Sequence, residues 1–131
     1  LVTMLHFDLP AALEKKGGWS RRESVDEFVE FAKLLYTNYG DRVKYWLTIN
    51  EQNMLTLVGD VIGTCNMEGV TNKYKKLYQE NHHMLLAQAK AMKLSMRCVL
   101  VQRLVLHQIF HWYILPHASR RMSWQHRTST R

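Results

Sequence analysis

Residues 43–51 of the chain read Val43-Lys44-Tyr45-Trp46-Leu47-Thr48-Ile49-Asn50-Glu51. β-Branched and aromatic side chains, which suit the pleated surface of a sheet, dominate the first seven positions. The pattern predicts a strand over 43–49. The two residues that follow place an amide and a carboxylate at the carboxyl end of that strand.

A second apolar run, Leu1–Leu5, lies upstream and is ended by His6-Phe7-Asp8-Leu9-Pro10. It predicts a short buried strand with a polar end. Between the two strands, Ser24-Val25-Asp26-Glu27 has the pattern of a capping box, in which the serine and Glu27 satisfy backbone amides at a helix start. An apolar stripe at helical spacing follows as far as Gly40, which can end the helix. The stripe comprises Val25, Phe28, Ala32, Leu35 and Tyr39.

Downstream of Glu51, a stretch with Gly59, Gly63 and Gly69 predicts a loop. A long helix is then predicted over residues 72–94. Its apolar side chains are Tyr74, Leu77, Tyr78, Leu85, Ala89 and Met92, on or near one face. The order strand, helix, strand, helix predicts parallel strands joined by right-handed crossovers, which is an α/β architecture.

The predicted strand ends carry the residues with chemistry. In α/β barrels, catalytic groups lie at the carboxyl ends of the strands. Glu51 suits general acid/base catalysis, and Asn50 and His6 can hydrogen-bond sugar hydroxyls. Candidate aromatic walls for a sugar are Phe7, Tyr45 and Trp46. The alternative is that Glu51 is a solvated loop carboxylate and His6 a core histidine.

Three motifs in this order and spacing resemble glycoside hydrolase family 1: His6-Phe7-Asp8-Leu9-Pro10, Gly17-Gly18-Trp19 and Tyr45-Trp46-Leu47-Thr48-Ile49-Asn50-Glu51. His82-His83, followed by Leu85, Ala87 and Ala89, is similar to that family's fourth helix. The resemblance covers residues 1–94. It implies part of a (β/α)8 TIM barrel of retaining β-glycosidases, with strand 3 at Leu1–Leu5, strand 4 at Val43–Ile49, and their helices.

By this resemblance, Glu51 is the catalytic acid/base, Asn50 contacts the sugar 2-hydroxyl and His6 contacts another ring hydroxyl. No cofactor or metal is implied, and we expect His82-His83 to serve packing and hydrogen bonding. The family's nucleophile lies near the seventh strand, and nothing in this chain resembles that segment. We therefore expect an inactive fragment.

The residues beside Glu51 depart from the usual family pattern. Gln52-Asn53 stand where most members have proline directly after the catalytic glutamate, and Phe7 stands where many have tryptophan. Both features resemble the bacterial 6-phospho-β-glucosidase branch. That branch implies a phosphorylated β-glucoside as the substrate and a cytoplasmic location. Its phosphate-binding residues lie further downstream than this resemblance extends.

The positive charge of the chain is concentrated in its last part. The formal net charge is +7, yet all 11 acidic residues lie between Asp8 and Glu80. Residues 95–131 contain six arginines, no acidic residue and no glycine. We therefore divide the chain into a partial barrel, residues 1–94, and a basic tail, residues 95–131.

The tail has three possible explanations. Back-translated with permitted codons and read one base out of register, residues 95–131 regain acidic residues, proline and glycine, and resemble the family's continuation. We therefore expect an out-of-frame segment that forms no part of the core. The alternatives are an inert gene remnant and a nucleic-acid-binding tail, in which arginines contact phosphates and Trp112, Tyr113 and Trp124 stack on bases.

Composition excludes several other classes of protein. No apolar run approaches the roughly 18 residues that a membrane-spanning helix needs. The two cysteines, Cys65 and Cys98, make neither a disulfide framework nor a zinc pattern, which favours a reducing compartment. The chain of 131 residues starts at Leu1 without a recognisable signal peptide, and we expect it to be a fragment.

Overall fold

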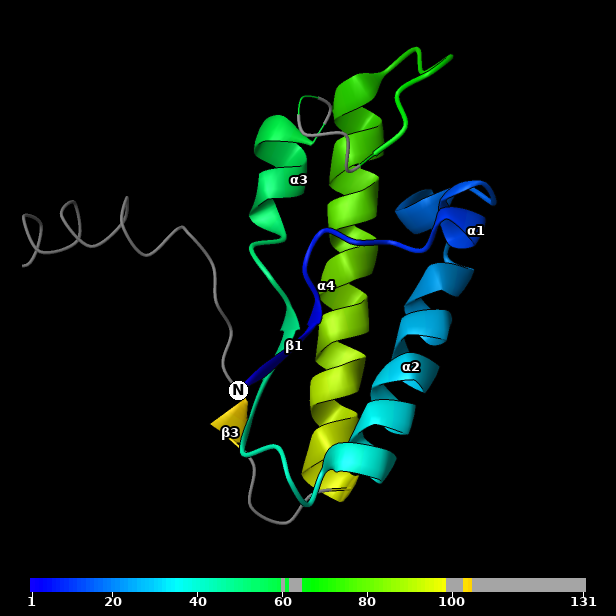
Figure 1. The fold of residues 1–131 in the computed structure, drawn as a ribbon. Helices are drawn as coiled ribbons and strands as arrows, with labels where there is room; N and C mark the ends of the chain where they lie inside the picture. Colours follow the sequence, from blue (N-terminus) through cyan, green and yellow to red (C-terminus); the bar gives the residue numbers. More distant parts are fainter. Residues whose placement is uncertain (60, 62–64, 99–102, 105–131) are drawn as a thin grey trace, which may run out of the picture.

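The computed structural model describes residues 1–59, 61, 65–98 and 103–104 (Figure 1). Its elements alternate between strands and helices, as an α/β fold requires. In chain order they are β1 (Val2–Leu5), α1 (Ala11–Glu14), the 3₁₀ turn η1 (Gly18–Ser20), α2 (Glu23–Tyr39), β2 (Tyr45–Ile49), α3 (Asn53–Val58), α4 (Lys73–Cys98) and β3 (Arg103–Leu104). None of the helices described is long and apolar enough to cross a membrane.

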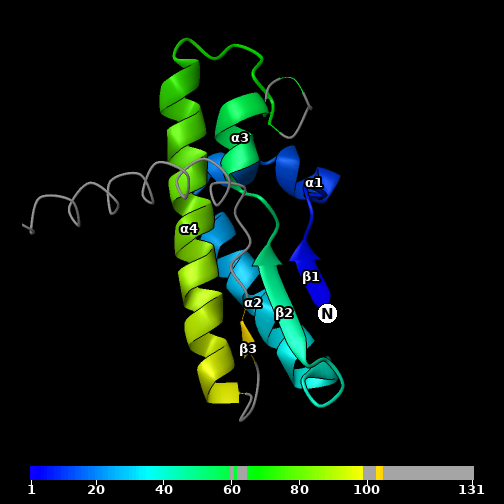
Figure 2. The same ribbon diagram turned by 90° about the vertical axis from the view of Figure 1, so that its left-hand side faces the viewer.

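The strands form one parallel sheet in the order β1-β2-β3. Val2 pairs with Trp46, and Leu5 pairs with Ile49, so β1 and β2 end at the same level. Helices α2 and α4 lie on the same face of this pair and run antiparallel to the strands (Figures 1 and 2). The predicted parallel strand–helix–strand arrangement is confirmed for the described part of the chain.

The buried interior lies between this strand pair and the two long helices. Val25 and Ala32 of α2 and Ala91 of α4 have no exposed surface, and small side chains allow the helices to approach closely. The ring of Trp46 packs edge-to-face on that of Tyr36, with centroids 5.3 Å apart. These contacts fix β2 against the helical layer.

Two predicted helix faces differ from the structure. In α2, Tyr36 is buried, whereas Tyr39 is 45% exposed near the end of the helix. In α4, Tyr74 and Tyr78 are exposed, and Leu77 is the member of the predicted stripe that is buried. The buried face of α4 also carries polar side chains, namely Glu80, His83, Gln88 and Ser95. Hydropathy alone misplaces this face because those polar residues interrupt it.

The predicted capping box is wrong. Helix α2 begins at Glu23, and its N-cap residue is Arg22. The hydroxyl of Ser24 is buried and donates to the Gly18 carbonyl at 2.6 Å. Ser24 therefore anchors the turn η1 to α2 instead of capping the helix. The predicted glycine-containing loop also holds a helix, α3, which was not expected.

The predicted helix end at Leu94 is also wrong. Helix α4 continues to Cys98, and the hydroxyl of Ser95 donates to the Met92 carbonyl at 2.8 Å. Neither glycine nor proline follows Leu94 until Pro116, so the sequence has no strong stop signal there. Arg103–Leu104 then pair with Tyr45–Trp46, so these two residues join the sheet, contrary to the expectation for the tail. The rest of the predicted tail lies outside the described residues.

Candidate active site

The carboxyl ends of β1 and β2 lie side by side. The Asn50 backbone N–H donates to the Leu5 carbonyl at 2.9 Å, which extends the strand pairing by one residue. Just beyond it, Asn50 Nδ2 and His6 Nε2 are 3.3 Å apart, with donor and acceptor set by the histidine tautomer. Asn50 is buried and His6 is exposed. The prediction that His6 and Glu51 lie at the same end of two neighbouring parallel strands is confirmed.

Both strands leave the sheet through an unusual backbone conformation. Phe7, after β1, has φ 70°, and Glu51, after β2, has φ 41°. Such left-handed values are uncommon for residues other than glycine, and they concentrate at functional sites. The Asp8 carboxylate stabilises the first turn by accepting from the His6 backbone N–H at 2.8 Å. The two turns thus present neighbouring polar residues at one edge of the sheet.

Glu51 occupies the turn between β2 and α3. It is half-buried, and its carbonyl accepts from the Met54 backbone N–H at 2.8 Å. A carboxyl group at this place can donate a proton to a substrate oxygen and later take one from water. The neighbouring buried amide of Asn50 adds a hydrogen-bonding group for a hydroxyl. The arrangement suits a polyhydroxylated substrate.

Sequence reasoning missed the connection between this turn and α4. Gln52 is 3% exposed, and its Nε2 donates to Asn81 Oδ1 at 3.2 Å. Asn53 is also buried. The signal in the sequence was the amide pair Gln52-Asn53 directly after Glu51, where the family resemblance expects proline.

Trp46 cannot serve as an aromatic wall for a sugar. Its side chain is 1% exposed because it packs between β2 and α2, against Tyr36. Phe7 remains accessible, with 37% of its surface exposed, and its ring lies edge-on to that of His6 at 5.3 Å between centroids. Of these two candidates, Phe7 is the one that a ligand can reach.

The adjacent histidines of α4 differ in environment. His83 is buried, and its Nδ1 lies 2.8 Å from the Trp19 carbonyl while its Nε2 lies 2.8 Å from Gln79 Nε2. His82 is exposed. The expected packing and hydrogen-bonding role is confirmed for His83. Within the part of the chain that the structure describes, no three His, Cys, Asp or Glu residues are grouped to hold a metal ion.

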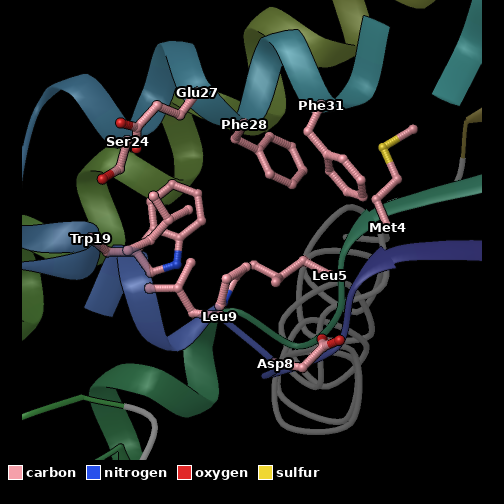
Figure 3. Close-up of a pocket in the computed structure, with 11 residues that line it drawn as sticks. Met4, Leu5, Asp8, Leu9, Trp19, Ser24, Glu27, Phe28 and Phe31 are labelled. Carbon is pink, nitrogen blue, oxygen red and sulfur yellow. The ribbon is translucent and has the colours of Figure 1, made fainter. Parts of the chain in front are cut away.

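A cavity whose lining includes neither His6 nor Asn50 lies beside β1 (Figure 3). It has a volume of about 300 Å³ and opens between β1, α2 and the segment around α1 and η1. Apolar side chains form most of its lining, with the carboxylates of Asp8 and Glu27 at its border. The labelled apolar residues are Met4, Leu5, Leu9, Trp19, Phe28 and Phe31. A second hollow of about 20 Å³ reaches Phe7, Asn50 and Gln52.

Known proteins of similar sequence are glycosidases. The chain is 42% identical to Beta-glucosidase A of Thermotoga maritima over 92 residues, and 40% identical to aryl-phospho-beta-D-glucosidase BglC of Bacillus subtilis over 94 residues. These alignments cover 70% and 71% of this chain, but 20% and 19% of the two relatives. The chain therefore spans about a fifth of the length of these curated relatives.

Solved structures give the same result for the fold. The family 1 β-glucosidase of Thermotoga maritima superposes with a TM-score of 0.69 at 38% identity, covering 79% of this chain and 23% of that one. The AHE enzyme of Alicyclobacillus herbarius gives 0.70 at 28% identity, covering 82% and 24%. The family 1 glycosidases have a TIM barrel fold, so the present α/β segment matches part of such a barrel.

The extent of the match differs between comparisons. The family model for Glycosyl hydrolase family 1 matches residues 1–122, which is most of the chain and continues past Leu94. The alignments with the two β-glucosidase relatives span only 92 and 94 residues. The division at Leu94 therefore stays a prediction, whereas the family does not depend on it. The chain belongs to glycosyl hydrolase family 1.

Proposed function

We propose that this chain carries the acid/base part of a retaining β-glycosidase, formed by strands 3 and 4 of the barrel and their helices. In this proposal β1 is strand 3 and β2 is strand 4. The observation that carries it is the 3.3 Å contact between Asn50 Nδ2 and His6 Nε2, directly before Glu51, in a family 1 chain. Two parallel strands thus bring a carboxyl, an amide and an imidazole to one edge of the sheet.

In the proposed reaction Glu51 acts twice. It first donates its proton to the glycosidic oxygen as the leaving group departs, while a second carboxylate attacks the anomeric carbon and forms a glycosyl-enzyme. Glu51 then accepts a proton from the water that hydrolyses this intermediate. The two carboxyl groups must be about 5–5.5 Å apart for this double displacement. The second carboxylate belongs to a part of the barrel that this chain does not resemble.

Asn50 and His6 are proposed to orient the sugar. Asn50 is fixed on the backbone by Leu5 and on the side chain by His6, so its remaining hydrogen-bonding groups have a defined direction. A fixed amide can bind the 2-hydroxyl, where interactions strengthen in the transition state. The exposed imidazole of His6 can bind a neighbouring hydroxyl. Phe7 supplies the adjacent apolar surface.

We further propose a phosphorylated β-glucoside as the substrate and a cytoplasmic location, because sugar transport systems deliver such substrates there. Gln52-Asn53 and Phe7 support the phosphate assignment, as does the similarity to the aryl-phospho-β-D-glucosidase of Bacillus subtilis. The 6-phospho-beta-galactosidase of Clostridium acetobutylicum is also 40% identical over 93 residues. The second candidate is an unphosphorylated β-glucoside, favoured by the 42% identity to the Thermotoga enzyme.

A segment exchange tests the role of Glu51. Residues 1–94 would replace the matched segment of the Thermotoga maritima β-glucosidase, and hydrolysis of an aryl β-glucoside would be measured. We expect activity in the hybrid, and a loss of about 10²–10⁴-fold in kcat/KM for substrates with poor leaving groups in Glu51→Gln. Added azide should restore turnover of substrates with good leaving groups by attacking the glycosyl-enzyme.

A matched control separates catalysis from folding. Glu30 lies on α2, and its side chain is 73% exposed, so Glu30→Gln removes an equal charge from a helix rather than from a strand end. It should leave kcat/KM within about twofold of the parent hybrid. An unchanged kcat/KM of the Glu51→Gln hybrid on substrates with poor leaving groups, or equal losses in both variants, would contradict the acid/base assignment.

The same exchange in two hosts tests the phosphate assignment. The segment would also be placed in the Bacillus subtilis aryl-phospho-β-D-glucosidase, and each hybrid assayed on its host's own substrate. If Gln52-Asn53 and Phe7 belong to the phosphate branch, the Bacillus hybrid should keep the larger fraction of its parent's kcat/KM. A larger retained fraction in the Thermotoga hybrid would favour the unphosphorylated substrate.

Residues 95–131 are proposed to be an out-of-frame segment. The support is compositional, since six arginines occur there without a single acidic residue; the family match up to residue 122 and the pairing of Arg103–Leu104 with β2 count against it. Sequencing the encoding DNA around Leu94 is the direct test, because a shifted frame would be visible at that point. An intact frame together with salt-dependent binding of DNA or RNA would replace this proposal by a nucleic-acid-binding tail.

A further inference from the structure

The two neighbours of Glu51 are tethered to different elements. On one side, the Asn50 backbone is hydrogen-bonded to Leu5 of β1 at 2.9 Å. On the other side, the Gln52 side chain is hydrogen-bonded to Asn81 of α4 at 3.2 Å. Asn50 and Gln52 are 8% and 3% exposed. Glu51 therefore lies between two buried residues whose positions are fixed by separate parts of the fold.

The backbone at Glu51 needs such support. Its φ of 41° is in the left-handed region, where a side chain crowds the backbone and the conformation persists only when surrounding contacts hold it. The following turn continues with Met54 N–H to the Glu51 carbonyl at 2.8 Å and Leu55 N–H to the Gln52 carbonyl at 3.1 Å. Glu51 is thus followed directly by Gln52, which is the N-cap residue of α3.

Packing alone does not account for a glutamine at position 52. Its Oε1 is buried and has no hydrogen-bond partner among the residues that the structure describes. A buried amide that is half satisfied is less favourable than an apolar side chain of the same shape. Packing would therefore be served better by methionine or leucine. The bond from Nε2 to α4 is the contact that distinguishes glutamine from them.

The backbone angle of Gln52 is one that proline could also adopt. Its φ of −56° lies within the range that a proline ring would fix, and the family resemblance expects proline at this position. In this chain a hydrogen bond to α4 can restrict the residue after Glu51, where a ring restricts it in other members. Helix α4 is thereby connected to the residue that carries the proposed chemistry.

We infer that Gln52, through its hydrogen bond to Asn81, is a positioning residue for Glu51. The inference rests on the proposed function, in which Glu51 is the acid/base. Asn81 acts through Gln52, so both residues serve the orientation of Glu51 and neither touches the substrate.

The test uses the full 131-residue chain and nuclear magnetic resonance. Gln52→Met removes the donor and keeps the side-chain length, while Asn81→Ala removes the acceptor and raises the helix propensity of α4. Two quantities would be measured: hydrogen exchange of the Met54 amide, and the ¹³Cα and ¹³Cβ shifts of Glu51, which report its backbone angles. Gln79→Met is the control, because Gln79 also makes one side-chain hydrogen bond on α4, to His83.

We expect both variants to accelerate exchange at Met54 by about five- to tenfold and to move the Glu51 shifts, while the control does neither. Asn81→Asp keeps the acceptor oxygen and should return exchange at Met54 to the parent rate. Unchanged exchange and shifts in both variants would overturn the inference. So would a uniform acceleration of all protected amides, since that would mean a merely structural role. Neither measurement needs turnover, so a failed segment exchange would count against the proposed function alone.

Discussion

The strand-end site and the cavity beside β1 differ in volume and in the kind of side chain that lines them. The cavity is wide and mainly apolar, whereas the polar side chains that could bind a substrate lie at the strand ends. The cavity of about 300 Å³ is lined mainly by apolar side chains that meet where α2 faces β1 (Figure 3). The strand-end site, formed by His6, Asn50, Glu51 and Gln52, borders a hollow of only about 20 Å³. Hydrogen bonds, rather than enclosure, mark the place where a polar substrate can be oriented.

The difference follows from what holds each region. The cavity is bounded by β1, which pairs with a single strand, β2, among the described residues, and by the apolar face of α2. Packing sets its size. The strand-end site is set by directional contacts between backbone and amide groups, which tolerate little displacement. Substitutions should therefore affect stability in the first region and orientation in the second.

The largest expected effect concerns the site in isolation. The full 131-residue chain should show no hydrolysis of an aryl β-glucoside or of its 6-phosphate above the buffer rate. A retaining reaction needs a second carboxylate about 5–5.5 Å from the first, and the alignments with the two curated relatives cover only 20% and 19% of their length. Product release would be followed spectrophotometrically. Turnover by purified protein that disappears in Glu51→Gln would contradict this expectation.

The next effect concerns the cavity wall. Phe28 is 7% exposed and packs against Trp19, with ring centroids 5.9 Å apart. Phe28→Ala should lower the free energy of unfolding by about 3–5 kcal/mol, which can leave a small domain unfolded. His6→Ala, at the exposed strand end, should change it by about 0.5 kcal/mol or less. Urea titration followed by circular dichroism measures both.

Similar losses in these two variants would break the distinction between the regions. The His6–Asn50 contact would then be a structural contact rather than one that orients a substrate. A small loss in Phe28→Ala alone would mean that the cavity wall adapts by collapse, since the cost of a truncation depends on how far the surroundings can relax.

The sequence predicted those parts of the strand-end site that depend on neighbouring residues. Parallel strands bring their carboxyl ends to one edge, so two apolar runs followed by His6 and by Asn50-Glu51 were sufficient to predict the juxtaposition. The bond between Gln52 and Asn81 could not be predicted in this way because the two residues are 29 positions apart. It depends on how α3 and α4 pack, which local patterns do not encode.

The same reasoning explains the other errors. Ser24 satisfies the criteria for a helix cap, but the nearby Gly18 carbonyl offers its hydroxyl a tertiary partner. The buried face of α4 contains Glu80, which accepts a hydrogen bond from the Ser20 hydroxyl, and His83, whose Nδ1 donates to the Trp19 carbonyl. Hydropathy periodicity assigns such polar residues to the solvent side. Tertiary partners decided these positions.

A smaller effect should distinguish the turn at Glu51 from the helix α2 by the sign of the change in the free energy of unfolding. Glu51→Gly removes a side chain from a left-handed residue, so it should raise the free energy of unfolding by about 0.5–1 kcal/mol. Glu30→Gly, in the interior of α2, should lower it by about 1 kcal/mol. Both values come from urea titration of the full chain. A destabilised Glu51→Gly variant would mean that contacts of Glu51 outweigh the backbone strain.

The smallest expected effect concerns the exposed ion pair between Asp26 of α2 and Lys90 of α4. A hydrogen bond from Lys90 and the positive charge of that residue lower the pKa of Asp26, which ties α2 to α4. Because the pKa of Asp26 is lower in the folded chain than in the unfolded chain, its ion pair with Lys90 stabilises the fold fully at pH values above the unfolded pKa. This stabilisation is lost as the pH falls through the folded pKa. Asp26→Asn should therefore destabilise the chain slightly at neutral pH, and the difference should vanish at an acid pH below the lowered folded pKa. The two side chains are 70% and 45% exposed, so about 1 M salt should also remove most of the difference.

Glu30→Gln, which breaks a pair within α2 alone, is the control. Thermal midpoints at both pH values measure the difference, and a gap that persists at low pH would show that Asp26 acts through packing rather than charge.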